Sequence, residues 1–98
     1  MKIERKECWN ANGLEVSVGT NCPKGGDSGA GGRTYFQIKD LASTDLEATI
    51  YEDSGSSTGI GAVEIRLGGD AECDTFIEAL EFAVATLKRQ RAENKAGN

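Results

Sequence analysis

The sequence contains no histidine, a single proline and no long apolar run, and these absences exclude several classes of protein. Without histidine, neither a Ser-His-Asp nor a Cys-His nucleophile can form, and no metal can be held by imidazole. A membrane span needs about 20 consecutive apolar residues, and the charged start at residues 1–7 leads into no signal-peptide core. We therefore expect a cytoplasmic protein without membrane contact.

The cysteines are also few and widely separated. Cys8, Cys22 and Cys73 form no C-x-x-C pair, and a zinc site would need a further ligand and clustered spacing. Free thiols are the expected state in a reducing compartment, so neither a metal nor a cofactor is predicted. Cys22 is the one candidate for a reactive thiol, because the ammonium of Lys24 lies close to it in sequence and favours a thiolate.

Length and charge restrict the possibilities further. The 98 residues suffice for one domain, residues 1–98, with a single small core. Eleven Lys and Arg against 16 Asp and Glu give a formal charge of −5. Such a chain lacks the positive field that a nucleic-acid backbone requires, so we expect no direct binding to it. Because the core is small, we expect a homo-oligomer to supply additional stability.

Alternation of apolar and polar residues predicts antiparallel strands. The period of two is clear in four segments and weaker in a fifth, namely residues 14–18, 34–39, 46–51, 63–67 and, weakly, 2–9. Short polar connections between neighbouring segments, including the loop at residues 53–59, favour a meander.

From Asp70 the apolar period changes to that of a helix. Gly68 and Gly69 end the preceding strand, Asp70 is a favourable N-cap, and the helix is expected to end near Arg91, with residues 92–98 as a frayed tail. The predicted buried stripe consists of Cys73, Phe76, Ile77, Leu80, Ala83, Val84 and Leu87.

These elements predict an α+β fold, in which an antiparallel sheet of four or five strands carries one C-terminal helix on one face. The other face of the sheet is then polar, and two interpretations of it stay open, a solvated surface or a contact with a partner. It is expected to display Glu15, Ser17, Tyr35, Gln37, Thr49, Tyr51, Glu64 and Arg66.

Residues 20–33 form a glycine-rich loop that matches no standard phosphate-binding, dinucleotide-binding or serine-protease motif. Successive glycines still permit backbone N–H groups to converge on an anion, and Arg33 supplies a fork of donors. The loop is either a ligand site or an ordinary surface loop. As a ligand site it would use Lys24, Gly25, Gly26, Asp27, Ser28, Gly29 and Arg33, with Tyr35 or Tyr51 stacking on a base.

The same region resembles a known group of proteins. Residues 19–29 read G-T-N-C-P-K-G-G-D-S-G and are followed by Gly32-Arg33-Thr34, while Gly68-Gly69-Asp70 and residues 76–80 occur downstream. This string is similar to short bacteriophage and prophage accessory proteins with a G-T-N-x-P-x-G-G-D-x-G…R-T loop. The resemblance carries no assigned activity, but it implies a small protein that counteracts a host defence.

Four functions follow from these features. The first is a non-catalytic protein that sequesters an anionic small molecule, such as a cyclic nucleotide or ADP-ribose-type signal, through the glycine-rich loop. The second is an inhibitor that binds a host defence protein, in the manner of an anti-CRISPR. The third is a phage structural or assembly protein. An enzyme that uses Asp27 with other carboxylates around a metal is disfavoured, because no constellation of ligands is evident.

Overall fold

The computed structural model describes residues 1–23, 31–53, 55 and 59–96. In this part of the chain the elements are, in order, β1 (Glu4–Trp9), β2 (Gly13–Thr20), β3 (Thr34–Ala42), β4 (Glu47–Glu52), β5 (Ile60–Arg66) and α1 (Asp70–Ala96). Every strand pair is antiparallel, which confirms the predicted α+β class with a C-terminal helix. The five strands divide between two sheets, a three-stranded sheet in the order β1-β2-β3 and a β4–β5 hairpin.

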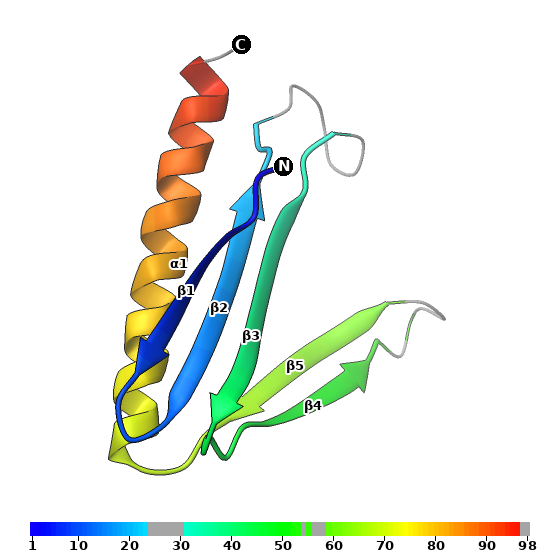
Figure 1. Cartoon of the computed structure of the whole chain (residues 1–98). Helices are drawn as coiled ribbons and strands as arrows, with labels where there is room; N and C mark the ends of the chain where they lie inside the picture. Colours follow the sequence, from blue (N-terminus) through cyan, green and yellow to red (C-terminus); the bar gives the residue numbers. More distant parts are fainter. Residues whose placement is uncertain (24–30, 54, 56–58, 97–98) are drawn as a thin grey trace.

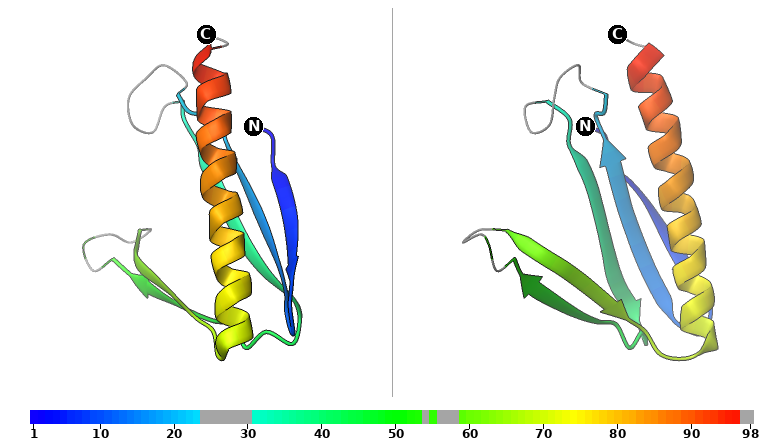
Figure 2. Two further views of the ribbon diagram at one scale, coloured as in Figure 1. Left: turned by 90° about the vertical axis from the view of Figure 1, so that its left-hand side faces the viewer. Right: turned by 180° about the vertical axis from the view of Figure 1, so that it is seen from behind.

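The hairpin projects away from the rest of the molecule (Figure 1). Helix α1 lies along one face of the three-stranded sheet, and β4 and β5 leave from the end of that sheet where α1 begins (Figure 2). Thr20 and Cys22, at the described start of the glycine-rich connection, lie at the opposite end, beside the last turns of α1 (Figures 1 and 2).

The core lies between α1 and β2, the central strand of the sheet. Val16 and Val18 of β2 pack with Cys8 of β1 and with Ala79 and Ala83 of α1. Burial and the nearby carboxylate of Glu78 raise the pKa of the Cys8 thiol, which therefore stays neutral in the core. All three cysteines are free, as predicted.

The helix turns a different face toward the sheet from the one predicted. Of the predicted stripe only Ala83 is buried, whereas Ile77, Leu80 and Val84 are 48%, 39% and 52% exposed and Cys73 is also exposed. The buried residues of α1 are Glu72, Thr75, Ala79, Ala83, Thr86 and Gln90. The small side chains of Ala79 and Ala83 let the helix approach β2 closely, and Glu72, Thr75 and Gln90 have hydrogen-bond partners, so this face is favoured although it is the less apolar.

At the start of α1, buried polar side chains form hydrogen bonds with residues outside the helix. The Asn12 side-chain amide donates to the hydroxyl of Thr44 at 2.8 Å and to that of Thr75 at 3.0 Å. The Glu72 carboxylate accepts from the backbone N–H groups of Asp45 at 2.9 Å and Gly68 at 3.1 Å. These bonds join the β3–β4 connection to the helix and replace the apolar contacts that the sequence pattern predicted.

The face of the three-stranded sheet opposite α1 also differs from the prediction. It carries Glu15 and Tyr35, but Thr49, Tyr51, Glu64 and Arg66 belong to the separate hairpin. Ser17 lies on this face yet is fully buried, because its cross-strand neighbours Arg5 and Gln37 have long side chains. Its hydroxyl has no hydrogen-bond partner among the described residues.

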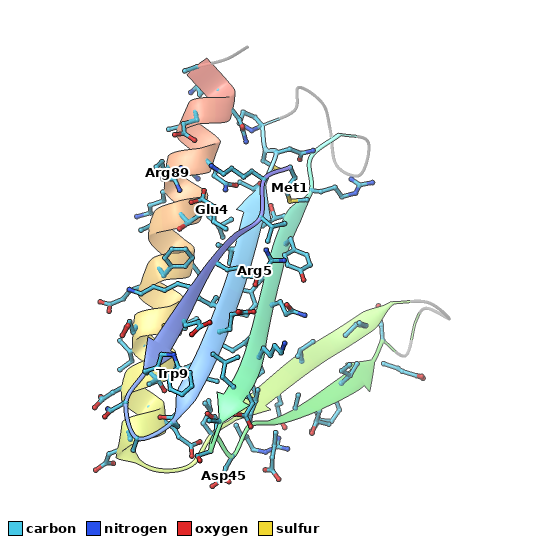
Figure 3. The ribbon with its side chains drawn as sticks, in the orientation of Figure 1. Met1, Glu4, Arg5, Trp9, Asp45 and Arg89 are labelled. Carbon is cyan, nitrogen blue, oxygen red and sulfur yellow. The ribbon has the colours of Figure 1, made fainter. Side chains whose placement is uncertain are left out.

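Trp9 packs across Gly13, its cross-strand partner, on this same face. A Cβ on Gly13 would collide with the indole ring, so the pairing requires glycine there. The indole N–H donates to the Glu7 carboxylate at 3.0 Å, and the Trp9 side chain stays 56% exposed (Figure 3).

The helix extends to Ala96, beyond the end expected from sequence. Asn94 lies within the segment predicted to fray, but its side-chain amide donates to the backbone carbonyls of Thr20 and Cys22, each at 3.0 Å. These bonds fasten the last turns of α1 to the end of β2. Charged residues occur throughout α1, and none of the helices in the described ranges is long and apolar enough to cross a membrane.

An ion pair joins α1 to the edge strand β1. The Arg89 guanidinium donates to the Glu4 carboxylate at 2.6 Å, and Figure 3 shows the two side chains meeting between the helix and β1. Hydrogen bonds from Arg89 and from Gln90 lower the pKa of Glu4 below its ordinary value of 4.5.

We predict that Glu4→Gln reduces the acid sensitivity of the fold. Because the folded-state pKa of Glu4 is depressed, its stabilisation is complete above pH 4.5 and is lost as the pH falls through the folded-state value. The melting temperature of the variant should therefore fall less steeply below pH 4.5 than that of the native chain. Thermal melts across the acid range measure this, with Glu7→Gln as a control that removes the same charge from an exposed site on the same strand. Equal acid dependence in all three proteins would refute the assignment.

Candidate functional site

A pocket lies where the glycine-rich connection meets the last turns of α1. Its volume is about 290 Å³, at the lower end of the range for small-molecule sites. Its lining comes from three elements and consists of Thr20, Cys22, Thr34, Val84, Leu87, Lys88 and Arg91. One wall is apolar and the others carry hydroxyls, a thiol and two cations, a combination typical of sites for amphipathic ligands.

Hydrogen bonds join the two ends of the glycine-rich connection, where Thr20 and Thr34 form the floor of this pocket. The backbone N–H of Asn21 donates to the Arg33 carbonyl at 3.2 Å, and the Arg33 N–H donates to the Asn21 side chain at 2.6 Å. The hydroxyls of Thr20 and Thr34 lie 3.0 Å apart, and that of Thr20 also donates to the Arg33 carbonyl. The chain therefore enters and leaves the loop at fixed positions.

The helix holds this floor from the other side. The backbone N–H of Thr20 donates to the side-chain carbonyl of Gln90 at 2.8 Å. The Gln90 amide in turn donates to the Lys2 carbonyl at 3.0 Å and to the Glu4 carboxylate at 2.7 Å. Together with the bonds from Asn94, these contacts couple the position of the pocket floor to the helix that supplies the cations.

The electrostatics of the pocket are cationic although the chain as a whole is acidic. Lys88 and Arg91 are both exposed, and neither forms an ion pair with a carboxylate in the described ranges. By contrast, Arg89 on the neighbouring face of α1 is paired with Glu4 and Glu93. Two unneutralised cations beside two hydroxyls form a surface suited to a phosphate or carboxylate group.

Cys22 and Gly32 approach each other closely within this site. A Cβ on Gly32 would lie 2.5 Å from the Cys22 sulfur, so a side chain there would displace the thiol that lines the pocket. The Cys22 sulfur lies 3.9 Å from the Thr34 hydroxyl, and the bond from Cys22 to Pro23 is cis. The tight contact explains why a glycine occupies position 32. The reactivity of the Cys22 thiol stays a prediction.

The residues predicted to bind a ligand fall into two groups. Lys24, Gly25, Gly26, Asp27, Ser28 and Gly29 lie outside the described residues. Arg33, Tyr35 and Tyr51 are described and exposed, but the two tyrosines lie on different sheets, Tyr35 on β3 and Tyr51 on the hairpin. The Arg33 guanidinium donates to the Gly32 carbonyl at 2.9 Å, at the edge of the loop.

Tyr51 is part of the polar surface of the hairpin. Its hydroxyl donates to the Glu64 carboxylate at 3.3 Å, and Glu64 also pairs with Arg66 at 2.6 Å. Since this group is on the arm that leaves the opposite end of the sheet, Tyr51 is not a neighbour of the pocket in a single chain.

Sequence reasoning did not identify Lys88 and Arg91 as site residues. Both were assigned only to the favourable positive charge near the end of a helix. Their spacing of three residues places them on adjacent turns of one face, together with Val84 and Leu87, and that spacing is the signal that was available. It could not indicate which loop they face.

Comparison of the chain with protein-family models, curated proteins and solved structures finds no match in any of the three. The resemblance to phage accessory proteins therefore stays a prediction.

Proposed function

We propose that the protein is a non-catalytic binder that sequesters a small anionic molecule in this pocket. The ligand class is a phosphorylated nucleotide signal, such as a cyclic nucleotide or an ADP-ribose derivative. The observation that supports this most strongly is the pair of unneutralised cations, Lys88 and Arg91, beside the apolar wall formed by Val84 and Leu87. A phosphate fits the cations and a base fits the wall.

The glycine-rich loop completes the proposed site. Its two described ends are joined by the Asn21–Arg33 hydrogen bonds, and Thr20, Cys22 and Thr34 at these ends line the pocket together with the cations. Backbone N–H groups of successive glycines are effective donors to phosphate oxygens. In this proposal Lys24, Asp27, Ser28 and Arg33 contact the phosphates and sugar hydroxyls. Tyr35 is not part of the proposed site, because it alternates with the pocket residue Thr34 and lies on the sheet face opposite α1.

The biological setting is proposed from the resemblance described above. A protein that holds a nucleotide signal without consuming it lowers the free concentration of that signal. In the cytoplasm of an infected host, this would prevent activation of a defence effector. The same role would require tight binding and an abundant protein but no catalysis.

Thermal melting with a panel of cyclic dinucleotides, cyclic mononucleotides and ADP-ribose derivatives tests the proposal. A ligand at a hundred times its Kd adds about 2.7 kcal/mol to the stability of the folded state. For a domain of this size we expect the melting temperature to rise by about 10 °C or more. Recovery of unaltered ligand after denaturation would show sequestration, whereas a converted product would contradict it. No shift with any member of the panel would remove the proposal.

A second candidate, binding to a host defence protein, is favoured by a different surface. Trp9 and Tyr35 are exposed on the sheet face opposite α1, and exposed aromatic side chains are enriched in protein interfaces. Co-purification from a host lysate distinguishes the two functions. A stoichiometric partner that co-purifies with the native chain and is lost in Trp9→Ala would favour this candidate, whereas the absence of any partner would favour sequestration. We also propose that the chain assembles into a homo-oligomer.

A further inference from the structure

The β4–β5 hairpin has one apolar face that nothing in the described chain covers. Cross-strand pairing places Ala48 opposite Ile65 and Ile50 opposite Val63, with all four side chains on one face. Ile50, Val63 and Ile65 are 63%, 58% and 37% exposed. A two-stranded hairpin is at best marginally stable in water, so this face needs a surface to pack against.

On the opposite face of the hairpin, the polar side chains already have hydrogen-bond and ion-pair partners. Arg66 donates to Glu64 at 2.6 Å and to Thr49 at 3.1 Å, and it pairs with Glu47 at 3.5 Å. The hairpin is therefore amphipathic: the polar side chains of one face pair with one another in water, whereas the apolar side chains of the other face are exposed. This division determines which face a partner would cover.

A second uncovered apolar surface lies on the body of the molecule. We define the α1 stripe as Ile77, Leu80 and Val84, which line a shallow depression of about 490 Å³ on the helix. Val84 and the neighbouring Leu87 also border the pocket shared with Thr34, so this flank of α1 faces β3. Phe36 of β3 is 42% exposed on the same side of the sheet, and β3 is an edge strand whose outer side is unpaired in the described chain.

The two surfaces are similar in length. On β5, Val63 and Ile65 are two residues apart, about 7 Å along the strand. On α1, Ile77 and Val84 are seven residues apart, a rise of about 10 Å, so the stripe is long enough to cover the apolar face of the hairpin. Addition of a hairpin to the edge of β3 would complete a five-stranded sheet whose apolar face lies beneath the α1 stripe.

The dimensions of a single chain also indicate a missing partner. The radius of gyration is 15.6 Å, against about 13 Å for a compact chain of this length. The accessible surface is 6530 Å², against roughly 5,400 Å² for a compact monomer of its mass. The excess, about 1,100 Å², exceeds the ~800 Å² that one partner buries in a standard interface.

We propose that two copies exchange their hairpins, each docking the apolar face of its β4–β5 hairpin against the α1 stripe and β3 edge of the other. Because every copy carries both the hairpin and the surface that receives it, the exchange is reciprocal and closes as a twofold dimer. The hairpin leaves the body through the short connection between β3 and β4, at the end away from the pocket (Figure 2). Val84 belongs both to the α1 stripe and to the apolar wall of the proposed pocket, so the docked hairpin borders that pocket, but the oligomeric state is measured without a nucleotide.

Light scattering coupled to gel filtration measures the assembly. The native chain is expected at twice its mass of 10.4 kDa. Val63→Glu on the hairpin and Val84→Glu on the stripe should each raise the dimer dissociation constant at least about a hundredfold, because each buries an unpaired carboxylate. Ala62→Glu, on the polar face of the hairpin, and Ala92→Glu, an exposed helix position, introduce the same charge and should leave the dimer intact.

Mixing the two monomeric variants distinguishes exchange from other modes of association. A pair made of Val63→Glu and Val84→Glu chains retains one contact in which both the hairpin and the stripe are native. The mixture should therefore recover heterodimer that neither variant forms alone. Circular dichroism checks that each variant is folded, and Ile50→Glu replaces Val63→Glu if that variant is not. A monomeric native chain, dimers unaffected by both variants, or a mixture that stays monomeric would each overturn the proposal.

Discussion

Reversing both pocket cations, with Lys88→Glu and Arg91→Glu in one chain, is expected to weaken nucleotide binding at least about a hundredfold. Each cation is expected to form a charge-assisted hydrogen bond with the ligand, worth about 1.5–3 kcal/mol. Since about 1.4 kcal/mol corresponds to a factor of ten in Kd, the loss of two such bonds gives at least two orders of magnitude. Repulsion between the new carboxylates and a phosphate adds to this loss. Isothermal calorimetry with the ligand identified by thermal melting measures the change.

A matched control separates the pocket from the overall charge. Lys39→Glu with Lys95→Glu also reverses two exposed cations, and both double variants have a formal charge of −9 rather than −5. The control residues lie outside the pocket lining. Equal weakening by both double variants would mean that the affinity depends on the overall charge of the chain and not on the two cations of the pocket. Unchanged affinity in the pocket variant would exclude this pocket as the site.

Gln90→Ala is expected to destabilise the folded chain by about 1–3 kcal/mol, the cost of a buried donor left without its acceptor. Gln90 is 4% exposed, and its side chain satisfies the N–H of Thr20 while it donates to Lys2 and Glu4. Alanine has the highest helix propensity, so loss of helix formation does not contribute to this estimate. For a domain of this size each kcal/mol corresponds to a fall of about 4–8 °C in melting temperature.

Urea denaturation gives the free energy of unfolding for this variant. Lys95→Ala, an exposed change in the last turn of the same helix, should alter that free energy by less than about 0.5 kcal/mol. Because Gln90 holds Thr20 at the pocket floor, nucleotide affinity should also fall in Gln90→Ala under conditions where it is fully folded. A variant as stable as the native chain would show that water replaces the lost amide, and that the link between helix and loop is weak.

The secondary structure was largely predictable because it depends on local patterns. Alternation clearly identified four of the five strands and indicated β1 only weakly, and the change of period at Asp70 identified the start of the helix. Local patterns were less informative about packing. The stripe at Ile77, Leu80 and Val84 is the most apolar face of α1, but the sheet covers the face with Ala79, Ala83 and Gln90 because small and hydrogen-bonded side chains permit closer contact.

The candidate site was likewise predictable in its local features and not in its long-range contacts. The glycine-rich segment was recognisable from composition, and Thr20 and Arg33 do mark its two ends. Lys88 and Arg91 were not recognisable as its partners, because more than fifty residues separate them from the loop in sequence. Tyr51 was grouped with Tyr35 on the assumption of a single sheet, and the division into two sheets separates them.

The order of residues alone therefore determined the class of fold, the strands, the start of the helix and the acidic character of the chain, since these depend on neighbours within a few positions. Only the tertiary structure decided which face of α1 is buried, which cations stand beside the glycine-rich segment, and that the β4–β5 hairpin leaves the sheet. Those outcomes depend on hydrogen bonds and close contacts between residues far apart in sequence, which a local sequence pattern does not predict.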